Sequence, residues 1–305
     1  MAINQRFIKQ VVHLTRSAWT SLRKNSGLWF RLAPALGLII LLYLGGLIMA
    51  FVQSMGYFPA LGMLDVSFDA YLNLFHRPDF LSSLSLTLWV SLISTITASI
   101  LALAVALLLR SVVIGKPWLT FLFELNLPIP HIVGAIGIYL LLNQSGLFAR
   151  LAYLGGLIQT PADFPALVFD KYAIGIIFEY VWKTSVFMGV NLLVALQTLG
   201  EDYEAVSSTL GANSWLRFRY VIFPLLKPTL ISSSILVFTF TFGGYEVPYI
   251  LGQRSNSLLP VLAYREYNQL DLTARPQAMA MSMVITLIIS ILIWLYMKIS
   301  RKSVR

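Results

Sequence analysis

Long apolar runs alternate with short polar segments along the chain. Six of these runs are long enough to cross a bilayer as a helix, which takes about 20 residues. They lie at Leu32–Val52, within Leu81–Leu109, and at Trp118–Leu142, Tyr172–Leu199, Leu225–Ile250 and Gln277–Met297. The pattern predicts an all-α membrane protein with six transmembrane helices.

Composition supports a membrane protein. Of the 305 residues, 58% are hydrophobic and 11% are charged, and the mean hydropathy is +0.77. Soluble domains carry about 25% charged residues. The chain has no cysteine, which excludes disulfides, thiolate nucleophiles and cysteine metal ligands. The net charge of +9 does not require a nucleic-acid partner, because basic loops on one membrane face produce the same value.

The distribution of Lys and Arg predicts the orientation, since cytoplasmic loops are enriched in both. With the N-terminus placed in the cytoplasm, fifteen Lys and Arg residues lie in inside segments and six in outside loops. We therefore expect both termini, and the loop at residues 200–224, to be cytoplasmic. The chain is predicted to be a multi-pass membrane protein.

The chain is predicted to form one membrane domain, residues 31–297, between two basic ends. Residues 1–30 are basic and amphipathic and precede the first apolar run. They are too long to be the charged region of a cleavable signal peptide. Two interpretations remain open, a cytoplasmic helix lying on the inner leaflet and a disordered tail. Residues 298–305 form a short basic cytoplasmic tail.

The most informative polar segment is Glu204–Pro224, EAVSSTLGANSWLRFRYVIFP. In it, Gly211 is followed after nine residues by Val221-x-Phe223-Pro224. The segment resembles the cytoplasmic signature of permeases in binding-protein-dependent type I ABC importers. The family's usual Glu falls on Ala205, and the Glu of this chain stands one position earlier, at Glu204. The alternative is an ordinary basic loop with a glycine cap and a proline at the next helix start.

The resemblance implies that this loop forms a short helix that docks on a separate ATPase subunit. The residues that it places in the ATPase-coupling segment are Asp202, Glu204, Ala205, Gly211, Ala212, Trp215 and Pro224. The displaced Glu leaves open which acidic side chain makes the ATPase contact.

Further resemblance extends over roughly residues 80–297. Thr241–Gly252 and Leu259–Met281 are similar to permeases grouped with spermidine/putrescine importers. The family implies a type I importer permease fold of five core helices plus an N-terminal one, in the inner (plasma) membrane of a bacterium. It also implies a pore shared with a second permease, for which a paralogue is favoured over an identical copy. Two ATPase subunits, which bind ATP and Mg²⁺, and an extracytoplasmic solute-binding protein complete the complex. The grouping suggests a polyamine or another organic cation as the solute.

Two charged residues interrupt the fourth apolar run. Charges at the centre of a spanning helix are costly and usually face a pore or a partner. Glu179 and Lys183 are four residues apart and share a helix face. They are therefore predicted either to form an internal ion pair or to line the pore.

Glu246 is the other candidate for contact with a solute. It follows Gly243-Gly244-Tyr245 and precedes Pro248 near the outer end of the fifth run. A carboxylate flanked by Tyr245 and Tyr249 suits an organic cation, by charge and by cation–π contact. The alternative is an interfacial residue paired with Arg254 or Arg265.

Paired prolines break the third apolar run at Leu127-Pro128-Ile129-Pro130-His131. Proline removes a helical hydrogen bond, and at membrane depth the freed carbonyls must be buried in protein or line a cavity. A cavity and a simple packing kink remain equally open as interpretations.

Nothing in the sequence indicates an enzyme. No GxxxxGK[ST] phosphate loop appears, and the three histidines show no metal-ligand spacing. We therefore expect no catalytic residue, metal or cofactor in this chain, and ATP bound only by partner subunits. The rival class is a stand-alone secondary transporter or channel, which would need inverted repeats or several ion-coupling charges.

Overall fold

The computed structural model describes residues 26–111, 115–199 and 202–303. This part of the chain is helical, and its only extended pairing is a single bridge between Phe58 and Met63. The chain divides into two units, Met1–Gln53 and Ser54–Arg305. Most of the predicted basic segment 1–30 lies outside the described residues.

The first unit is a helical run that accounts for the first predicted span. It consists of helix α2 (Ser26–Ile39), the π-helical turn η1 (Ile40–Leu44) and helix α3 (Gly45–Ser54). Phe30–Ser54 is long and apolar enough to cross a membrane.

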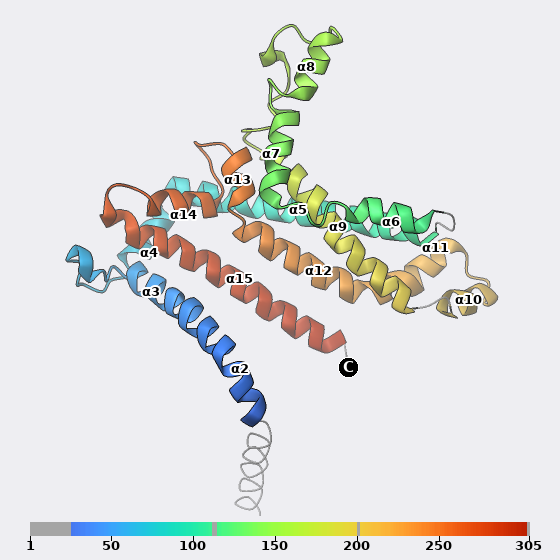
Figure 1. The fold of residues 1–305 in the computed structure, drawn as a ribbon, viewed down its shortest axis with the longest axis horizontal. Helices are drawn as coiled ribbons and strands as arrows, with labels where there is room; N and C mark the ends of the chain where they lie inside the picture. Colours follow the sequence, from blue (N-terminus) through green and yellow to red (C-terminus); the bar gives the residue numbers. More distant parts are fainter. Residues whose placement is uncertain (1–25, 112–114, 200–201, 304–305) are drawn as a thin grey trace, which may run out of the picture. The chain divides into compact units, whose positions relative to one another are not determined.

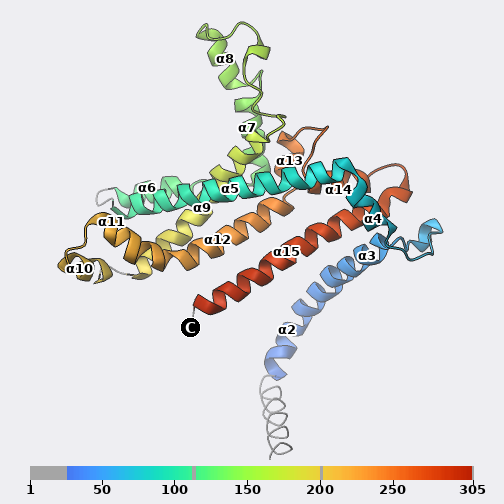
Figure 2. The same cartoon turned by 180° about the vertical axis from the view of Figure 1, so that it is seen from behind.

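The second unit holds the remaining spans. Figures 1 and 2 show α5, α9, α12 and α15 running alongside one another, while α7 leaves this bundle and carries α8 away from it. The α-helices are α4 (Asp69–His76), α5 (Pro78–Ser111), α6 (Lys116–Glu124), α7 (His131–Leu142), α8 (Leu147–Leu154), α9 (Ile174–Leu199), α10 (Asp202–Thr209), α11 (Ser214–Arg217), α12 (Phe223–Gly243), α13 (Glu246–Leu251), α14 (Leu259–Tyr267) and α15 (Arg275–Ser303).

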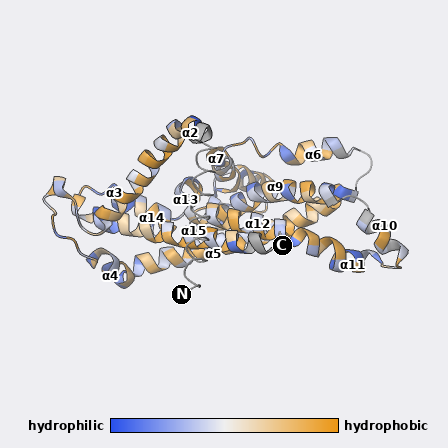
Figure 3. Cartoon of the chain, turned by 90° about the horizontal axis from the view of Figure 1, so that it is seen from below, coloured by the Kyte–Doolittle hydropathy of each residue, from blue (hydrophilic) through white to orange (hydrophobic). Residues whose placement is uncertain are grey.

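Small residues on α5 let the bundle pack closely. Its buried face carries Ala98, Ala102 and Ala106 at four-residue spacing, against Leu192 of α9 and Leu226 of α12. Small side chains allow helix backbones to approach, as is common in membrane bundles. Apolar residues run along the long helices, and hydrophilic ones gather at their ends and in the connections (Figure 3).

Six segments of the described chain are long and apolar enough to cross a membrane, which confirms the predicted fold class. The third differs from the expected Trp118–Leu142, because α6 and α7 are separate helices joined by a turn at residues 125–130. Pro128 and Pro130 cannot donate helical hydrogen bonds and end the helix instead of kinking it. The apolar segment here is His131–Leu154, covering α7 and α8.

The fifth span also starts earlier than the predicted Leu225. A continuous helical segment runs from Ser214 through α11 and the π-helical turn η4 (Phe218–Ile222) into α12. Pro224 therefore lies inside the segment rather than at its start. The π-helical turn η4 comes just before Pro224. Proline disturbs the regular helical hydrogen bonds at this point, and a π-turn is one way in which a helix accommodates such a disturbance.

Candidate functional site

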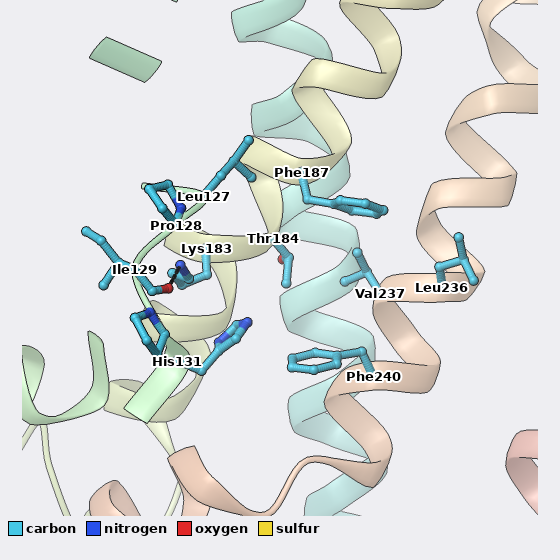
Figure 4. Close-up of a pocket in the computed structure, with 11 residues that line it drawn as sticks. Leu127, Pro128, Ile129, His131, Lys183, Thr184, Phe187, Leu236, Val237 and Phe240 are labelled. Carbon is cyan, nitrogen blue, oxygen red and sulfur yellow. Dashed lines mark hydrogen bonds between the residues drawn. The ribbon is translucent and has the colours of Figure 1, made fainter. Parts of the chain in front are cut away.

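A cavity of about 540 Å³ lies between the α6–α7 turn, α9 and α12 (Figure 4). Three segments far apart in sequence build it. Its wall is formed by Leu127, Pro128, Ile129, Pro130, His131, Lys183, Thr184, Phe187, Leu236, Val237 and Phe240. The proline break is thus part of a cavity wall, which is one of the two outcomes that the sequence left open.

Lys183 ties the proline turn to α9. Its ammonium donates to the carbonyl of Asn126 at 2.6 Å and to the carbonyl of Ile129. The Asn126 carbonyl also accepts from the Ile129 N–H at 3.3 Å, within the turn. The Asn126 side chain in turn donates to the Trp182 carbonyl at 3.0 Å. The ammonium of a buried lysine is therefore held by two carbonyls of the turn at residues 125–130.

Glu179 is fully buried and is held by His131 of α7. The Nδ1 atom of His131 lies 2.9 Å from Oε1 and 3.2 Å from Oε2 of the carboxylate. Gly134 permits this approach, since a Cβ there would lie 3.1 Å from Oε1 of Glu179.

The predicted ion pair between Glu179 and Lys183 is wrong, because each side chain has found another partner. Their four-residue spacing places them on one helix face. However, Glu179 contacts His131 at the start of α7, and Lys183 donates to the Asn126 carbonyl in the preceding turn. Both residues nevertheless border the same region of the bundle, and Lys183 lines the cavity.

His131 is the site residue that the sequence did not single out. Its ring lies 4.7 Å from the Phe240 ring and 6.3 Å from the Tyr180 ring, centroid to centroid. The sequence did contain a signal for this contact, because His131 and Glu179 are both ionisable residues in apolar runs, where each needs a partner. The two residues are 48 positions apart, so their spacing did not indicate that they pair.

The predicted solute-contact residues at the start of α13 form a second, aromatic cluster. Tyr245 and Tyr249 stack with ring centroids 5.1 Å apart, and Tyr264 of α14 lies 4.7 Å from Tyr245. Tyr245 and Tyr264 also line a cleft of about 440 Å³. Glu246 is exposed beside them.

Glu246 does not adopt the alternative pairing. Within the described part of the chain, no ion pair joins Glu246 to Arg254 or Arg265. Arg265 instead donates to the Arg254 carbonyl at 2.6 Å. The break between α12 and α13 is fixed by Gly244, because a Cβ at that position would clash with the Tyr180 hydroxyl.

The predicted coupling segment forms two short helices joined by a tight turn. Gly211 has a φ of +78°, a left-handed conformation that glycine adopts readily, and directly follows the turn that ends α10. The N–H of Ala212 donates to the Ser207 carbonyl at 3.0 Å, which is the hydrogen bond of a Schellman cap. Asn213 begins α11 by accepting from the Leu216 N–H at 2.9 Å.

Large apolar side chains on this segment are exposed. Trp215 is 66% exposed, Leu210 81% and Tyr220 72%. Asp202, Glu204 and Ala205 lie on α10, and their side chains lie outside the described part of the structure.

Within the described residues, no group of three or more His, Asp or Glu side chains is arranged to hold a metal ion. The ionisable residues near the cavity are instead paired with each other or with carbonyls.

Comparison with known families identifies the chain. Residues 30–305 match the family model described as the binding-protein-dependent transport system inner membrane component. The chain belongs to this family. It is a multi-pass permease of the inner membrane, as its apolar segments predicted.

Curated relatives of this permease carry different solutes. The trehalose/maltose transport system permease protein MalF of Thermococcus litoralis is 28% identical over 237 residues, 76% of this chain and 78% of the relative. The trehalose transport system permease protein SugA of Mycobacterium tuberculosis is 26% identical over 186 residues, 60% of this chain and 58% of the relative. A putative ferric transport permease, FbpB 1 of Haemophilus influenzae, is 28% identical over 238 residues, 73% of this chain and 35% of the relative.

A solved structure supports the fold. A chain from a bacterial ABC transporter that imports the acidic polysaccharide alginate superposes with a TM-score of 0.77 and 17% sequence identity. The match covers 94% of this chain and 99% of the other. The same kind of transporter, solved with a pentasaccharide-bound periplasmic protein, gives a TM-score of 0.75 at 19% identity.

Proposed function

We propose that this permease forms half of the translocation pore of an ATP-driven ABC importer. Its partners are a second permease, two ATPase subunits that bind ATP and Mg²⁺, and an extracytoplasmic solute-binding protein. The displaced Glu204 favours a paralogue over an identical copy as the second permease. The chain itself has no catalytic role.

The observation that carries this proposal is the helix–turn–helix at residues 202–217. Its capped turn at Gly211 and exposed Trp215 present an apolar surface on the side assigned to the cytoplasm. Family membership supports the assignment, because a permease of a binding-protein-dependent system needs a contact with its energy-supplying subunit. ATP binding would move this segment and reorient the spans.

The solute is a small compound delivered from outside, and it would pass the aromatic cluster at Tyr245 and Tyr249 and the cavity beside Glu179 and Lys183. The suggested polyamine rests on Glu246 and its tyrosines. The relatives reported above do not support it, since their names specify trehalose, maltose and ferric systems. The importer assignment does not depend on which solute is correct.

The absence of cysteine allows a direct test of the docking surface. Leu210→Cys, on the predicted cytoplasmic side, and Leu270→Cys, in the loop after α14 on the opposite side, each place one thiol at an exposed leucine. Each variant is labelled with benzophenone maleimide in the purified complex and irradiated. We expect an adduct with the ATPase subunit from position 210 and none from position 270.

Two results would overturn the proposal. One is an ATPase adduct formed equally from both positions or only from position 270. The other is solute uptake by the chain reconstituted without an ATPase subunit, which would favour a stand-alone transporter or channel.

A further inference from the structure

We propose that the His131–Glu179 pair makes the cavity selective for a solute hydroxyl group, so that the transported solute is a neutral, hydroxylated compound such as a sugar. This inference rests on the proposed importer function and adds the chemical class of its solute. It disfavours oxyanions, and it predicts that a hydroxylated solute is preferred over a polyamine.

Hydrogen bonds within the protein occupy most polar groups of the cavity wall. Lys183 donates to the carbonyls of Asn126 and Ile129, at the back of the proline turn. The Thr184 hydroxyl donates to the Tyr180 carbonyl at 2.6 Å. These groups hold the wall in place, because each already has a hydrogen-bond partner within the protein.

His131 is the exception. Its Nδ1 atom faces Glu179, and among the described residues no hydrogen bond involves Nε2. The side chain is 25% exposed, and its ring projects toward Phe240 across the cavity (Figure 4). Nε2 is therefore a side-chain nitrogen of the wall that has no hydrogen-bond partner among the described residues and can bind a ligand.

Glu179 determines how Nε2 can be used. With Nδ1–H donated to the carboxylate, a neutral imidazole presents Nε2 as an acceptor, and a protonated one presents it as a donor. An ammonium group satisfies only the first state and an oxyanion only the second. A hydroxyl group both donates and accepts, so it satisfies either state.

The surrounding charges also disfavour an anion. Glu179 and Lys183 of α9 have opposite charges, and Glu246 begins α13, which packs against both α7 and α9. Tyr180, the remaining titratable group beside His131, is a buried neutral phenol. The sum over these groups is −1 with neutral His131 and zero with protonated His131, so neither state gives a net positive site.

The rest of the cavity suits a ring with apolar faces. Phe187 and Phe240 lie on different helices and both border the space beside His131 (Figure 4). Binding sites for small molecules combine such apolar walls with a few placed polar groups. A sugar ring offers C–H faces to the aromatic rings and hydroxyls to Nε2.

The test uses the complete importer, with its binding protein, in proteoliposomes. Uptake of labelled trehalose, maltose, spermidine and sulfate is measured together with ATP hydrolysis. We expect the wild type to take up at least one of the two sugars. We expect His131→Leu to lower sugar uptake per ATP about tenfold, because the substitution removes one hydrogen bond at a buried site. His131→Gln, which keeps a polar group, should retain more uptake than His131→Leu.

His76→Leu is the matched control, because it makes the same change at an exposed histidine of α4, outside the cavity. It should leave uptake unchanged. Preferred uptake of spermidine or sulfate, or sugar uptake that His131→Leu does not reduce, would overturn the inference while leaving the importer function intact. Absence of ATP-dependent uptake of every probe, with no stimulation of the ATPase by the binding protein, would count against the importer function itself.

Discussion

Two buried charges on α9 are neutralised by different routes, although they lie one helical turn apart. Glu179 uses the imidazole of His131, and Lys183 uses the backbone carbonyls of Asn126 and Ile129. A charge left alone at this depth would be costly. The α6–α7 turn therefore supplies the partners of Lys183 and the start of α7 supplies the partner of Glu179, so this segment and α9 stabilise each other.

Lys183→Met tests this dependence. The substitution keeps the volume and removes the donor for the carbonyls of Asn126 and Ile129, so we expect a loss of about 1–3 kcal/mol in stability. The thermal unfolding temperature of the purified complex should fall accordingly. Thr198→Val, on an exposed face of α9 near its cytoplasmic end, is the control and should have little effect.

A double-mutant cycle distinguishes the two pairings directly. We expect a larger coupling energy between His131→Leu and Glu179→Gln than between Lys183→Met and Glu179→Gln, because only the first pair is hydrogen bonded. Unfolding of the four variants of each cycle gives both values. A larger coupling for Glu179 with Lys183 would restore the ion pair predicted from the sequence.

At the level of elements, one arginine joins three helices at the predicted outer face. Arg77, just before α5, donates to Glu266 of α14 at 2.6 Å, to Gln277 of α15 at 2.7 Å, and to Asp79. The hydrogen bond to Asp79, with support from Glu266, raises the pKa of Arg77. The guanidinium of Arg77 therefore stays charged throughout the working pH range. Deprotonation of Arg77 does not weaken its hydrogen bonds to the three helices in that range.

Arg77→Gln should separate these helix ends. Glu266 is 6% exposed, and removal of its charged donor leaves a buried carboxylate without its main partner. We expect a loss of about 1.5–3 kcal/mol, seen as a lower unfolding temperature. Arg254→Gln, a loss of the same charge at an exposed position of the adjacent loop, is the control. Equal unfolding temperatures for the two variants would contradict the role of Arg77.

The helices also show which parts of the fold can be predicted from the sequence. Apolar run length predicts six spans because the bilayer imposes a minimum helix length. It misplaces the third and fifth span boundaries, since Pro128 and Pro130 end a helix whereas Pro224 sits within one. Proline alone does not specify which outcome occurs, because neighbouring groups decide whether the freed carbonyls are satisfied.

The candidate site is less accessible to prediction than the fold. Glu179 and Lys183 stand out locally as charges in an apolar run, and local spacing suggests that they pair. Their actual partners lie about fifty residues earlier, on a segment whose direction depends on the turn at residues 125–130. Gly211, by contrast, lies in a contiguous segment, and its positive φ agrees with the glycine cap that the alternative interpretation of this segment predicted.

For the whole molecule, transport requires that the coupling segment and the cavity act together. The capped turn at Gly211 follows α9, which carries Glu179 and Lys183, and precedes α12, which carries Phe240. Movement of residues 202–217 would therefore be passed to two walls of the cavity. The central claim is that ATP hydrolysis on another subunit drives solute movement through this connection.

Gly211→Pro tests that claim most directly, by measurement of solute uptake and ATP hydrolysis in the same proteoliposomes. Proline cannot adopt the φ of +78° found at Gly211, so the turn between α10 and α11 must change. Ser214→Pro is the control, because proline is favoured at the first position of a helix. We expect Gly211→Pro to lower uptake per ATP at least tenfold while Ser214→Pro keeps it. Wild-type uptake per ATP in Gly211→Pro would contradict the account.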